Sequence, residues 1–254
     1  MNLKTINVAR YVTPLREGGS LPAIIEDDEQ KLYVLKFRGA GQGPKALIAE
    51  LVSGEIGRVL GFRVPEIAFA ELDTALAKTE PDPEIQDLIN FSGGLNLAVE
   101  YLSGSITYDP LMIEPEARAA SEIVWFDAFT ANVDRTPRNA NILYWQDNLW
   151  LIDHGAALYF HHNWERFPGN VNNPFPLIKD HILLAFANQI EEADQILSQK
   201  LSPQILAGIV ELIPDQWLED PTGQRKVYLE FLTRRLELRD AFVKEAINAR
   251  KMRL

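Results

Sequence analysis

The stretch NVDRTPRNANILYWQDNLWLIDHG, residues 132–155, decides the fold expected for this chain. It contains two short apolar runs around a polar turn at residues 146–148, which is the pattern of a β-hairpin. Because a hairpin folds back on itself, Asn139 before its first strand and Asp153 after its second should meet at its open end. Asp134 lies shortly before Asn139 and should stand beside them. The sequence therefore predicts two carboxylates and an amide at one end of a hairpin.

This set of side chains predicts a particular chemistry. An amide oxygen and a carboxylate are hard oxygen ligands suited to Mg²⁺, which keeps water and substrate phosphate oxygens in its other positions. Asn139 and Asp153 are therefore the expected metal ligands. The separate carboxylate of Asp134 is suited to orient an attacking hydroxyl group and accept its proton. Together they predict a metal site beside a carboxylate that can activate a hydroxyl group.

Composition excludes several other classes of protein. With 254 residues and 46% hydrophobic content, the chain has room for one large domain or two joined lobes. Its formal charge of -11 disfavours binding to nucleic acid, and the absence of cysteine excludes disulfides and thiolate chemistry. No signal peptide pattern and no run of about 18 apolar residues occurs. We expect a cytoplasmic protein without a membrane span.

The spacing in this stretch resembles the catalytic core of HipA-like kinases, which are related to phosphatidylinositol kinases within the protein kinase-like superfamily. The shared pattern is an aspartate, four intervening residues, an asparagine, and a short hairpin that ends in Asp-x-Gly. The wider group often has a histidine where this chain has Thr136. Arg138 matches the basic residue before the asparagine, and the resemblance implies that it stabilises charge on the transferring phosphoryl group.

The resemblance implies an α+β, bilobal, protein-kinase-like fold. Residues 1–103 should form an N-lobe, a small antiparallel sheet with one helix, and residues 104–254 a mainly helical C-lobe that carries the catalytic loop and metal site. HipA-like toxins have an additional N-terminal subdomain, for which this chain begins too close to its first kinase-like strand. We therefore expect a stand-alone kinase domain, and toxin function does not carry over.

The first lobe contains the residues expected to hold ATP. Strands are predicted at 6–12, 21–25 and 32–37 as a meander, then a helix at about 45–60 with Pro44 in its first turn and Gly61 past its end. The resemblance implies that Lys36, on the third strand, reaches the α- and β-phosphates and that Glu50, on the helix, is its ion-pair partner. The small residues around Glu50 on its helix face are Ala46, Ser53, Gly54 and Gly57, so another segment can approach closely there.

Other contacts to the nucleotide are implied by the resemblance alone. The segment at 97–102 looks like the hinge of HipA-like kinases, in which backbone groups of Glu100 and Leu102 would bind the adenine edge. Gly18, Gly19 and Ser20 fall where a turn would cover the phosphates. Short strands are expected near 64–71 and 96–102, with a short helix near 81–83.

The second lobe should be built from helices. They are predicted at about 115–132, 176–199, 203–213 and 223–250, with an irregular aromatic stretch at 159–175.

Simpler structural explanations exist for most of these residues. Lys36 could be a solvated strand residue, Glu50 a surface charge, and Arg135 and Arg138 members of surface ion pairs. Gly18 to Ser20 could form only a hairpin turn.

Two other motifs fail on their spacing. The glycines at 39, 41 and 43 suggest a dinucleotide fingerprint, but the third glycine would have to replace Pro44. We expect them to form a flexible connection near the phosphates, where Lys45 could assist. The four histidines lack zinc-site spacing and are expected to be ordinary loop residues.

Three functions remain open at this point. The first is a HipA-like serine/threonine protein kinase that uses ATP and Mg²⁺ on an unknown acceptor. The second is a pseudokinase, a nucleotide-binding interaction module without transfer. The third is a small-molecule kinase, since the same ATP site can serve metabolite hydroxyls.

Overall fold

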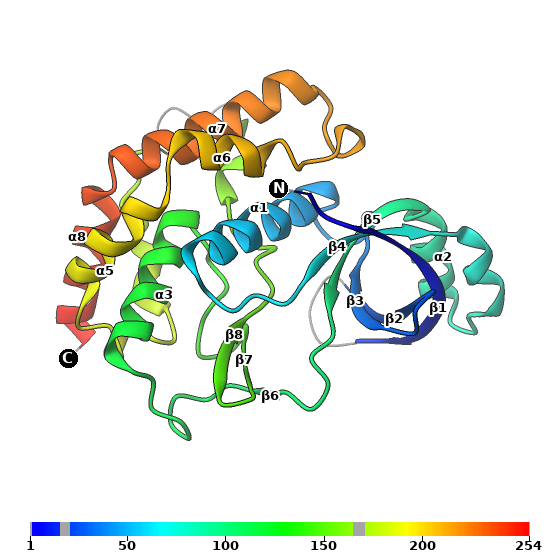
Figure 1. Ribbon diagram of the computed structural model, residues 1–254, viewed down its shortest axis with the longest axis horizontal. Helices are drawn as coiled ribbons and strands as arrows, with labels where there is room; N and C mark the ends of the chain where they lie inside the picture. Colours follow the sequence, from blue (N-terminus) through cyan, green and yellow to red (C-terminus); the bar gives the residue numbers. More distant parts are fainter. Residues whose placement is uncertain (1, 16–20, 165–170, 254) are drawn as a thin grey trace.

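A small barrel of strands forms the N-terminal part of the fold, in a computed structural model that describes residues 2–15, 21–164 and 171–253. Five strands pair in the order β1-β2-β3-β5-β4 and close on themselves (Figure 1). They are β1 (Thr5–Pro14), β2 (Ala23–Asp27), β3 (Leu32–Lys36), β4 (Ile67–Leu72) and β5 (Gly94–Glu100). The strand-rich N-terminal part predicted from the sequence is confirmed.

Alternating burial along the strands gives the barrel its interior. Ile25 on β2 and Tyr33 and Leu35 on β3 point inward and are fully buried, whereas the residues between them are more exposed. Four of the five strand pairings are antiparallel, as predicted, but β1 pairs with β4 in parallel. A closed ring of five strands cannot alternate direction throughout, so one pairing must be parallel.

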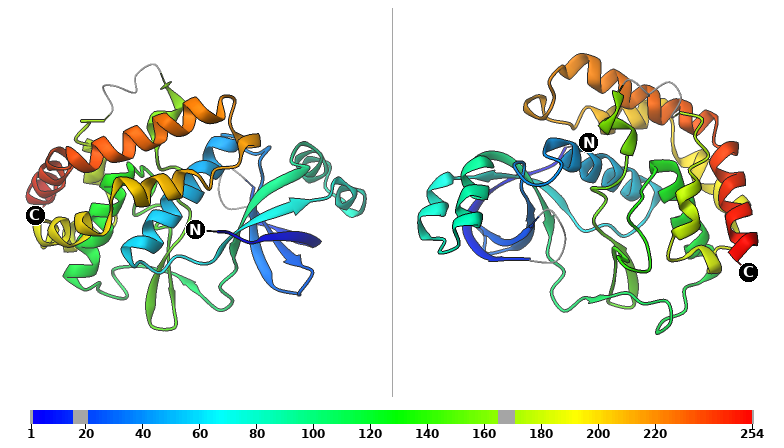
Figure 2. Two further views of the ribbon diagram at one scale, coloured as in Figure 1. Left: turned by 45° about the horizontal axis from the view of Figure 1, so that its top comes forward. Right: turned by 180° about the vertical axis from the view of Figure 1, so that it is seen from behind.

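Helix α1 (Pro44–Leu60) lies between the barrel and the helical part of the molecule (Figures 1 and 2). Pro44 occupies its first turn, and Gly61 ends it in a left-handed conformation with a φ of 97°. The close approach predicted beside Glu50 is confirmed. A Cβ on Gly54 would lie 2.5 Å from Cδ1 of Ile67, the first residue of β4.

Smaller elements complete the barrel region and lead to the predicted hairpin. Helix α2 (Pro83–Phe91) lies where a short helix was expected, and the 3-10 helix η1 (Thr74–Thr79) precedes it. A three-stranded sheet is built from β6 (Ile106–Thr107), β7 (Ile142–Trp145) and β8 (Asn148–Leu151).

The C-terminal part is helical, as predicted, but its helices are shorter than the sequence pattern indicates. The α-helices are α3 (Ala117–Thr130), α5 (Ile190–Leu197), α6 (Pro203–Val210), α7 (Pro221–Glu237) and α8 (Asp240–Arg253). The 3-10 helices are η2 (Tyr159–His162), η4 (Pro176–Asp180), η5 (Leu184–Phe186), η6 (Ser198–Lys200) and η7 (Asp215–Trp217). Most of their apolar residues join one large core that also takes in the apolar face of α1.

Two predicted helices are wrong in extent. The single helix expected at 223–250 is divided after Glu237, because the chain turns there and α8 packs back against α3 and η4. The helix expected at 176–199 exists only as the short α5, preceded by the 3-10 turns η4 and η5. Apolar periodicity records burial and carries no information about such changes of direction.

Across the described ranges, no helix combines the length and the apolar character needed to cross a membrane.

Candidate active site

The predicted hairpin is present, and hydrogen bonds beyond its strands hold its open end together. β7 and β8 pair antiparallel with Ile142 opposite Leu151. The Ile152 N–H donates a hydrogen bond of 3.1 Å to the Asn141 carbonyl. The Arg135 guanidinium donates to the same carbonyl. The loop that carries Asp134 is therefore fixed to the hairpin, and Asp153 comes shortly after the second strand of that hairpin.

Asp134 and Asn139 are in direct contact. The Asn139 amide donates a hydrogen bond of 2.8 Å to Oδ2 of Asp134. A tight turn brings the two together, because Thr136 and Asn139 exchange backbone hydrogen bonds of 2.9 and 3.0 Å. Asp134 is half-buried, whereas Asn139 is exposed. The predicted position of Asp134 beside Asn139 is thus confirmed.

The electrostatic surroundings raise the pKa of Asp134. Burial is the largest cause, and the nearby negative charge of Asp153 adds to it. Hydrogen bonds from Asn139 and Asn141 act in the opposite direction, because they favour the ionised carboxylate. Asp134 is therefore a carboxylate with increased affinity for a proton.

Asn141 is a site residue that the sequence argument missed. Its amide nitrogen lies 3.4 Å from Oδ2 of Asp134 and 3.5 Å from the backbone carbonyl of Asp153. It is buried and has a φ of 48°, a left-handed conformation that asparagine tolerates better than most residues. Its position immediately before the first hairpin strand was the only signal that could have identified it.

Lys36 joins the two halves of the site. At the end of β3, its ammonium group lies 2.7 Å from Oε2 of Glu50 and 2.6 Å from Oδ1 of Asp153. The ion pair predicted between Lys36 and Glu50 is therefore confirmed, and the solvated-lysine alternative is wrong. Lys36 brings together the barrel, helix α1 and the residue that follows the hairpin.

This cluster keeps its charges near neutral pH. Burial alone would lower the pKa of Lys36, but the charges of Asp153 and Glu50 outweigh it and raise the pKa. Burial would raise the pKa of Glu50, yet Lys36 and His154 hold it well below its ordinary value. Glu50 is 1% exposed, so it is a buried carboxylate and no surface charge.

The segment around Asp153 has an unusual backbone. Asp153 has a φ of 52°, and its side chain is 50% exposed, so its carboxylate borders the solvent. Left-handed conformations cost energy for residues other than glycine and persist where the surrounding structure enforces them. His154, which comes next in the chain and was expected to be an ordinary loop residue, is fully buried. Its Nδ1 lies 3.6 Å from Oε1 of Glu50.

Arg135 is a buried residue, so the alternative explanation that it belongs to a surface ion pair is wrong. Its Nε lies 2.5 Å from Oδ2 of Asp127 on α3, and both side chains are inaccessible to solvent. His181 and Asn132 also hydrogen-bond to the Asp127 carboxylate, at 2.9 and 3.0 Å. Burial opposes ionisation of Asp127, but Arg135 and His181 hold its pKa well below the ordinary value. This network anchors the loop that carries Asp134.

The predicted hinge residues lie at the end of β5. The Glu100 N–H donates to the Glu66 carbonyl at 2.8 Å, and the Leu102 carbonyl accepts from the Ser105 N–H at 3.1 Å. The Glu100 side chain lies 3.0 Å from the Lys31 ammonium. Half of the backbone groups in the predicted adenine contact are therefore already engaged within the protein.

The other predicted residues lie apart from this cluster or outside the described ranges. Arg138 is exposed on the turn that ends at Asn139. Lys45 lies over the Trp164 ring, with its nitrogen 5.8 Å from the ring centre. Gly18, Gly19 and Ser20 fall outside the residues that the structure describes.

The residues present fit a hard divalent cation that is completed by substrate. Within the described ranges, no group of three or more histidine, aspartate and glutamate side chains could hold a metal. The hard oxygen ligands that the site could contribute are the carboxylate of Asp153 and the amide oxygens of Asn139 and Asn141. Such an incomplete set suits Mg²⁺, whose other positions are filled by phosphate oxygens and water.

Comparison with known proteins identifies related sequences and folds. A family model described as HipA-like kinase matches residues 8–244. The Helicobacter pylori proinflammatory kinase CtkA superposes with a TM-score of 0.57 and 13% identity, covering 98% of this chain and 99% of that one. The Golgi casein kinase superposes with a TM-score of 0.56 and 12% identity, covering 95% of this chain and 74% of that one. The structure of that kinase with Mn and ADP bound superposes with a TM-score of 0.55 and 13% identity, and the coverage of both chains is the same. At these identities the solved structures show a shared kinase fold. No curated protein gives a significant sequence match.

Proposed function

The chain belongs to the HipA-like kinase family and is therefore a phosphotransferase, and we propose that it transfers the γ-phosphoryl group of ATP to serine or threonine hydroxyls of a protein. One observation carries this proposal. Lys36 contacts Glu50 and Asp153 together, and Asp134 and Asn139 lie in contact on the loop tied to the same hairpin.

Lys36 and Glu50 have the charges and positions needed to hold phosphate groups. A lysine whose cation is fixed by a buried carboxylate presents its charge in a constant place, which favours binding of the α- and β-phosphates. Asp153 contacts this lysine and keeps half of its side chain exposed, so it is accessible to a cation on the phosphates. Mg²⁺ would supply neutralisation of the charge on the transferring group.

Asp134 is placed to act on the acceptor. Its carboxylate is half-buried, has a raised pKa and is held by the amide of Asn139. We assign it the orientation of the hydroxyl group and acceptance of its proton. Arg138 is exposed on the same turn, and we assign its guanidinium to the charge that develops on the phosphoryl group.

The adenine edge would meet the backbone of the hinge. The Glu100 carbonyl and the Leu102 N–H are an acceptor and a donor two positions apart in the chain. We assign these two groups to the adenine ring. The phosphate-covering role of Gly18, Gly19 and Ser20 and the cytoplasmic location stay predictions from the sequence.

The proposal is tested by direct phosphoryl transfer. Purified protein is incubated with γ-labelled ATP, Mg²⁺ and separate panels of serine/threonine peptides, tyrosine peptides and small-molecule alcohols. We expect label on the serine/threonine panel, and a loss of at least about a thousandfold in Asp153→Ala. Asp147→Ala, at the opposite end of the hairpin, is the matched control and should keep its activity.

The outcomes separate the alternatives. Full transfer by Asp153→Ala would refute the assigned site. Label confined to small alcohols, identified by mass spectrometry, would replace the protein acceptor with a metabolite. Nucleotide-induced thermal stabilisation without any transfer would favour a nucleotide-binding module.

A further inference from the structure

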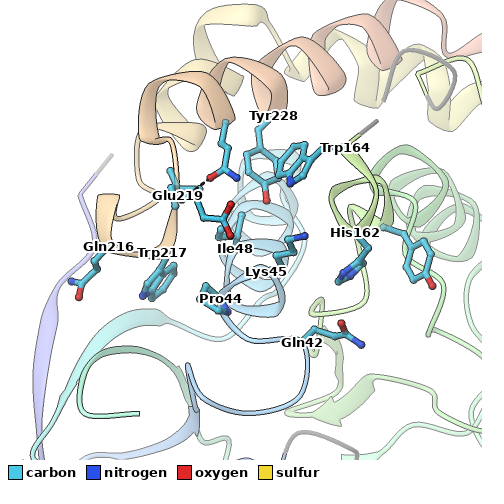
Figure 3. Close-up of a pocket in the computed structure, with 13 residues that line it drawn as sticks. Gln42, Pro44, Lys45, Ile48, His162, Trp164, Gln216, Trp217, Glu219 and Tyr228 are labelled. Atoms are coloured by element: carbon cyan, nitrogen blue, oxygen red, sulfur yellow. Dashed lines mark hydrogen bonds between the residues drawn. The ribbon is translucent and has the colours of Figure 1, made fainter. Parts of the chain in front are cut away.

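A cavity of about 580 Å³ lies against the first turns of α1 (Figure 3). Its walls come from three parts of the chain that are distant in sequence: the start of α1, the 3-10 turn η2 with the residues after it, and the segment from η7 into α7. The residues that matter below are Lys45, His162, Trp164, Trp217, Glu219 and Tyr228. None of the residues assigned to phosphoryl transfer lines this cavity.

Helical geometry separates this cavity from the nucleotide site. Lys45 and Glu50 are five positions apart on α1, which places them about 140° apart around the helix axis. Glu50 contacts Lys36 on one side, whereas Lys45 lines the cavity on another. The two sites therefore share α1 as a common wall and use different faces of it.

Lys45 gives the cavity a positive charge that is not neutralised by a direct ion pair with any described residue. Among the described residues, no carboxylate lies within ion-pair distance of its ammonium group, whose recorded neighbour is the Trp164 ring. Burial lowers the pKa of the neighbouring His162, and the charge of Lys45 lowers it further. Glu219 also lines the cavity, but it is exposed. One negative group on a ligand would satisfy this lysine.

Aromatic rings form the other walls, and contacts within the protein hold these rings in place. The Trp217 N–H donates to the Leu95 carbonyl at 3.2 Å, and the Tyr228 hydroxyl lies 2.9 Å from Nδ1 of the buried His161. Trp164 packs edge-on against Tyr228, with ring centres 5.4 Å apart. Because these polar atoms of Trp217 and Tyr228 have partners within the protein, their rings offer the cavity mainly apolar surface. Such a wall is preformed.

We propose that this cavity binds a small planar aromatic acid with a single negative charge. Its volume falls within the roughly 300–1,000 Å³ typical of small-molecule sites. The ring of the ligand would lie against Trp164 and Trp217, with its acid group on Lys45. The exposed carboxylate of Glu219 disfavours more highly charged anions such as nucleoside triphosphates. A bound acid would link α1, which carries Glu50, to the segment that follows Asp153.

Three probes that share one ring system test this site. Indole-3-acetate, indole and tryptamine differ in carrying a negative charge, no charge or a positive charge, and their affinities are measured by calorimetry on the full chain. We expect the acid to bind at least about tenfold more tightly than indole, because it alone pairs with Lys45. Tryptamine should bind most weakly.

Variants assign the charge effect to one residue. Lys45→Gln should remove the preference for the acid and leave the affinity for indole unchanged. Lys78→Gln, which alters an exposed lysine on η1, is the matched control and should retain the preference. Trp164→Leu should weaken all three probes. Thermal unfolding of each variant shows that it is folded.

Three results would overturn the proposal: equal affinity for the three probes, an acid affinity unchanged in Lys45→Gln, or no acid binding at millimolar concentration. Addition of ADP with Mg²⁺ should leave acid binding in place, and displacement would assign the acid to the nucleotide site instead. The Asp153→Ala variant should still bind the acid, so the outcome is independent of the proposed phosphoryl transfer.

Discussion

At the scale of single residues, the candidate site depends on the hydrogen bonds that two asparagines donate to one aspartate. Asn139 and Asn141 both direct amide nitrogens toward the carboxylate of Asp134. Burial and the charge of Asp153 raise the pKa of Asp134, and these two hydrogen bonds act against that rise. Asn139 is exposed on its turn, whereas Asn141 is buried and also lies 3.5 Å from the Asp153 carbonyl. Either amide oxygen has the chemistry of a Mg²⁺ ligand.

Substitution of each asparagine should separate the two effects. If Asp134 accepts the proton, kcat/KM falls as pH drops through its pKa, which lies above the ordinary aspartate value of about 3.9. Asn139→Ala removes a hydrogen bond to the ionised form, so this acidic limb should move to higher pH. If Asn139 is the ligand, the Mg²⁺ concentration for half-maximal rate should also rise about tenfold or more.

Asn141→Ala is the matched comparison. It should move the acidic limb in the same direction with little change in the Mg²⁺ requirement. A large rise in the Mg²⁺ requirement for Asn141→Ala alone would transfer the ligand role to Asn141. An acidic limb that stays in place in both variants would contradict the role assigned to Asp134.

At the scale of elements, the loop that carries Asp134 is held by a buried charge network. Asp127 on α3 accepts hydrogen bonds from Arg135 and Asn132 of the loop and also contacts His181 after η4. The sequence separation between Asp127 and His181 is 54 residues, so the network joins elements that are distant in the sequence. Removing one partner of a buried pair is costly because the other charge stays buried.

Asp127→Asn should therefore lower the free energy of unfolding by roughly 3–5 kcal/mol. Urea unfolding at pH 7 measures this, with the exposed Asp87→Asn on α2 as the control, for which little change is expected. Because the folded pKa of Asp127 is depressed, its stabilisation is present above the unfolded value of about 3.9 and is lost as pH falls below it. The two variants should consequently differ least in acid, and equal stabilities at pH 7 would contradict the network's role.

At the scale of the whole molecule, the C-terminal part reaches back to hold the barrel and α1 (Figure 2). Lys200 donates to the Leu60 carbonyl at the end of α1, at 2.5 Å. Trp217 donates to the Leu95 carbonyl of β5 and packs edge-on against Phe69 of β4, with ring centres 5.8 Å apart. The C-terminal part is thus joined both to α1, which carries Glu50, and to the barrel, which carries Lys36.

Trp217→Ala tests this long-range connection. Loss of the buried indole should cost about 3–5 kcal/mol in the free energy of unfolding, and it removes a contact between the C-terminal part and the barrel. Denaturant unfolding followed by circular dichroism measures the change. Trp150→Ala on the half-buried hairpin is the comparison and should cost less. A loss below about 1 kcal/mol in Trp217→Ala would show that the contact contributes little.

The sequence by itself determined the local parts of this protein. Alternation of apolar residues around a polar turn specified the hairpin, and Pro44 and Gly61 marked the ends of α1, because such signals act over a few residues. The ion pair of Lys36 with Glu50 was predicted from the resemblance to HipA-like kinases, and the structure adds the contact of Lys36 with Asp153. The phosphate-binding and metal-binding roles of these residues stay predictions.

Only the tertiary structure decided which charges are buried and where helices turn. Arg135 lies inside the molecule because Asp127 and His181 meet it there, and no local pattern encodes partners so far apart. The division between α7 and α8 and the cavity beside Lys45 likewise arise from packing between distant elements. Burial and ion pairing depend on which surfaces meet, and a chain specifies that through many weak contacts at once rather than through any single motif.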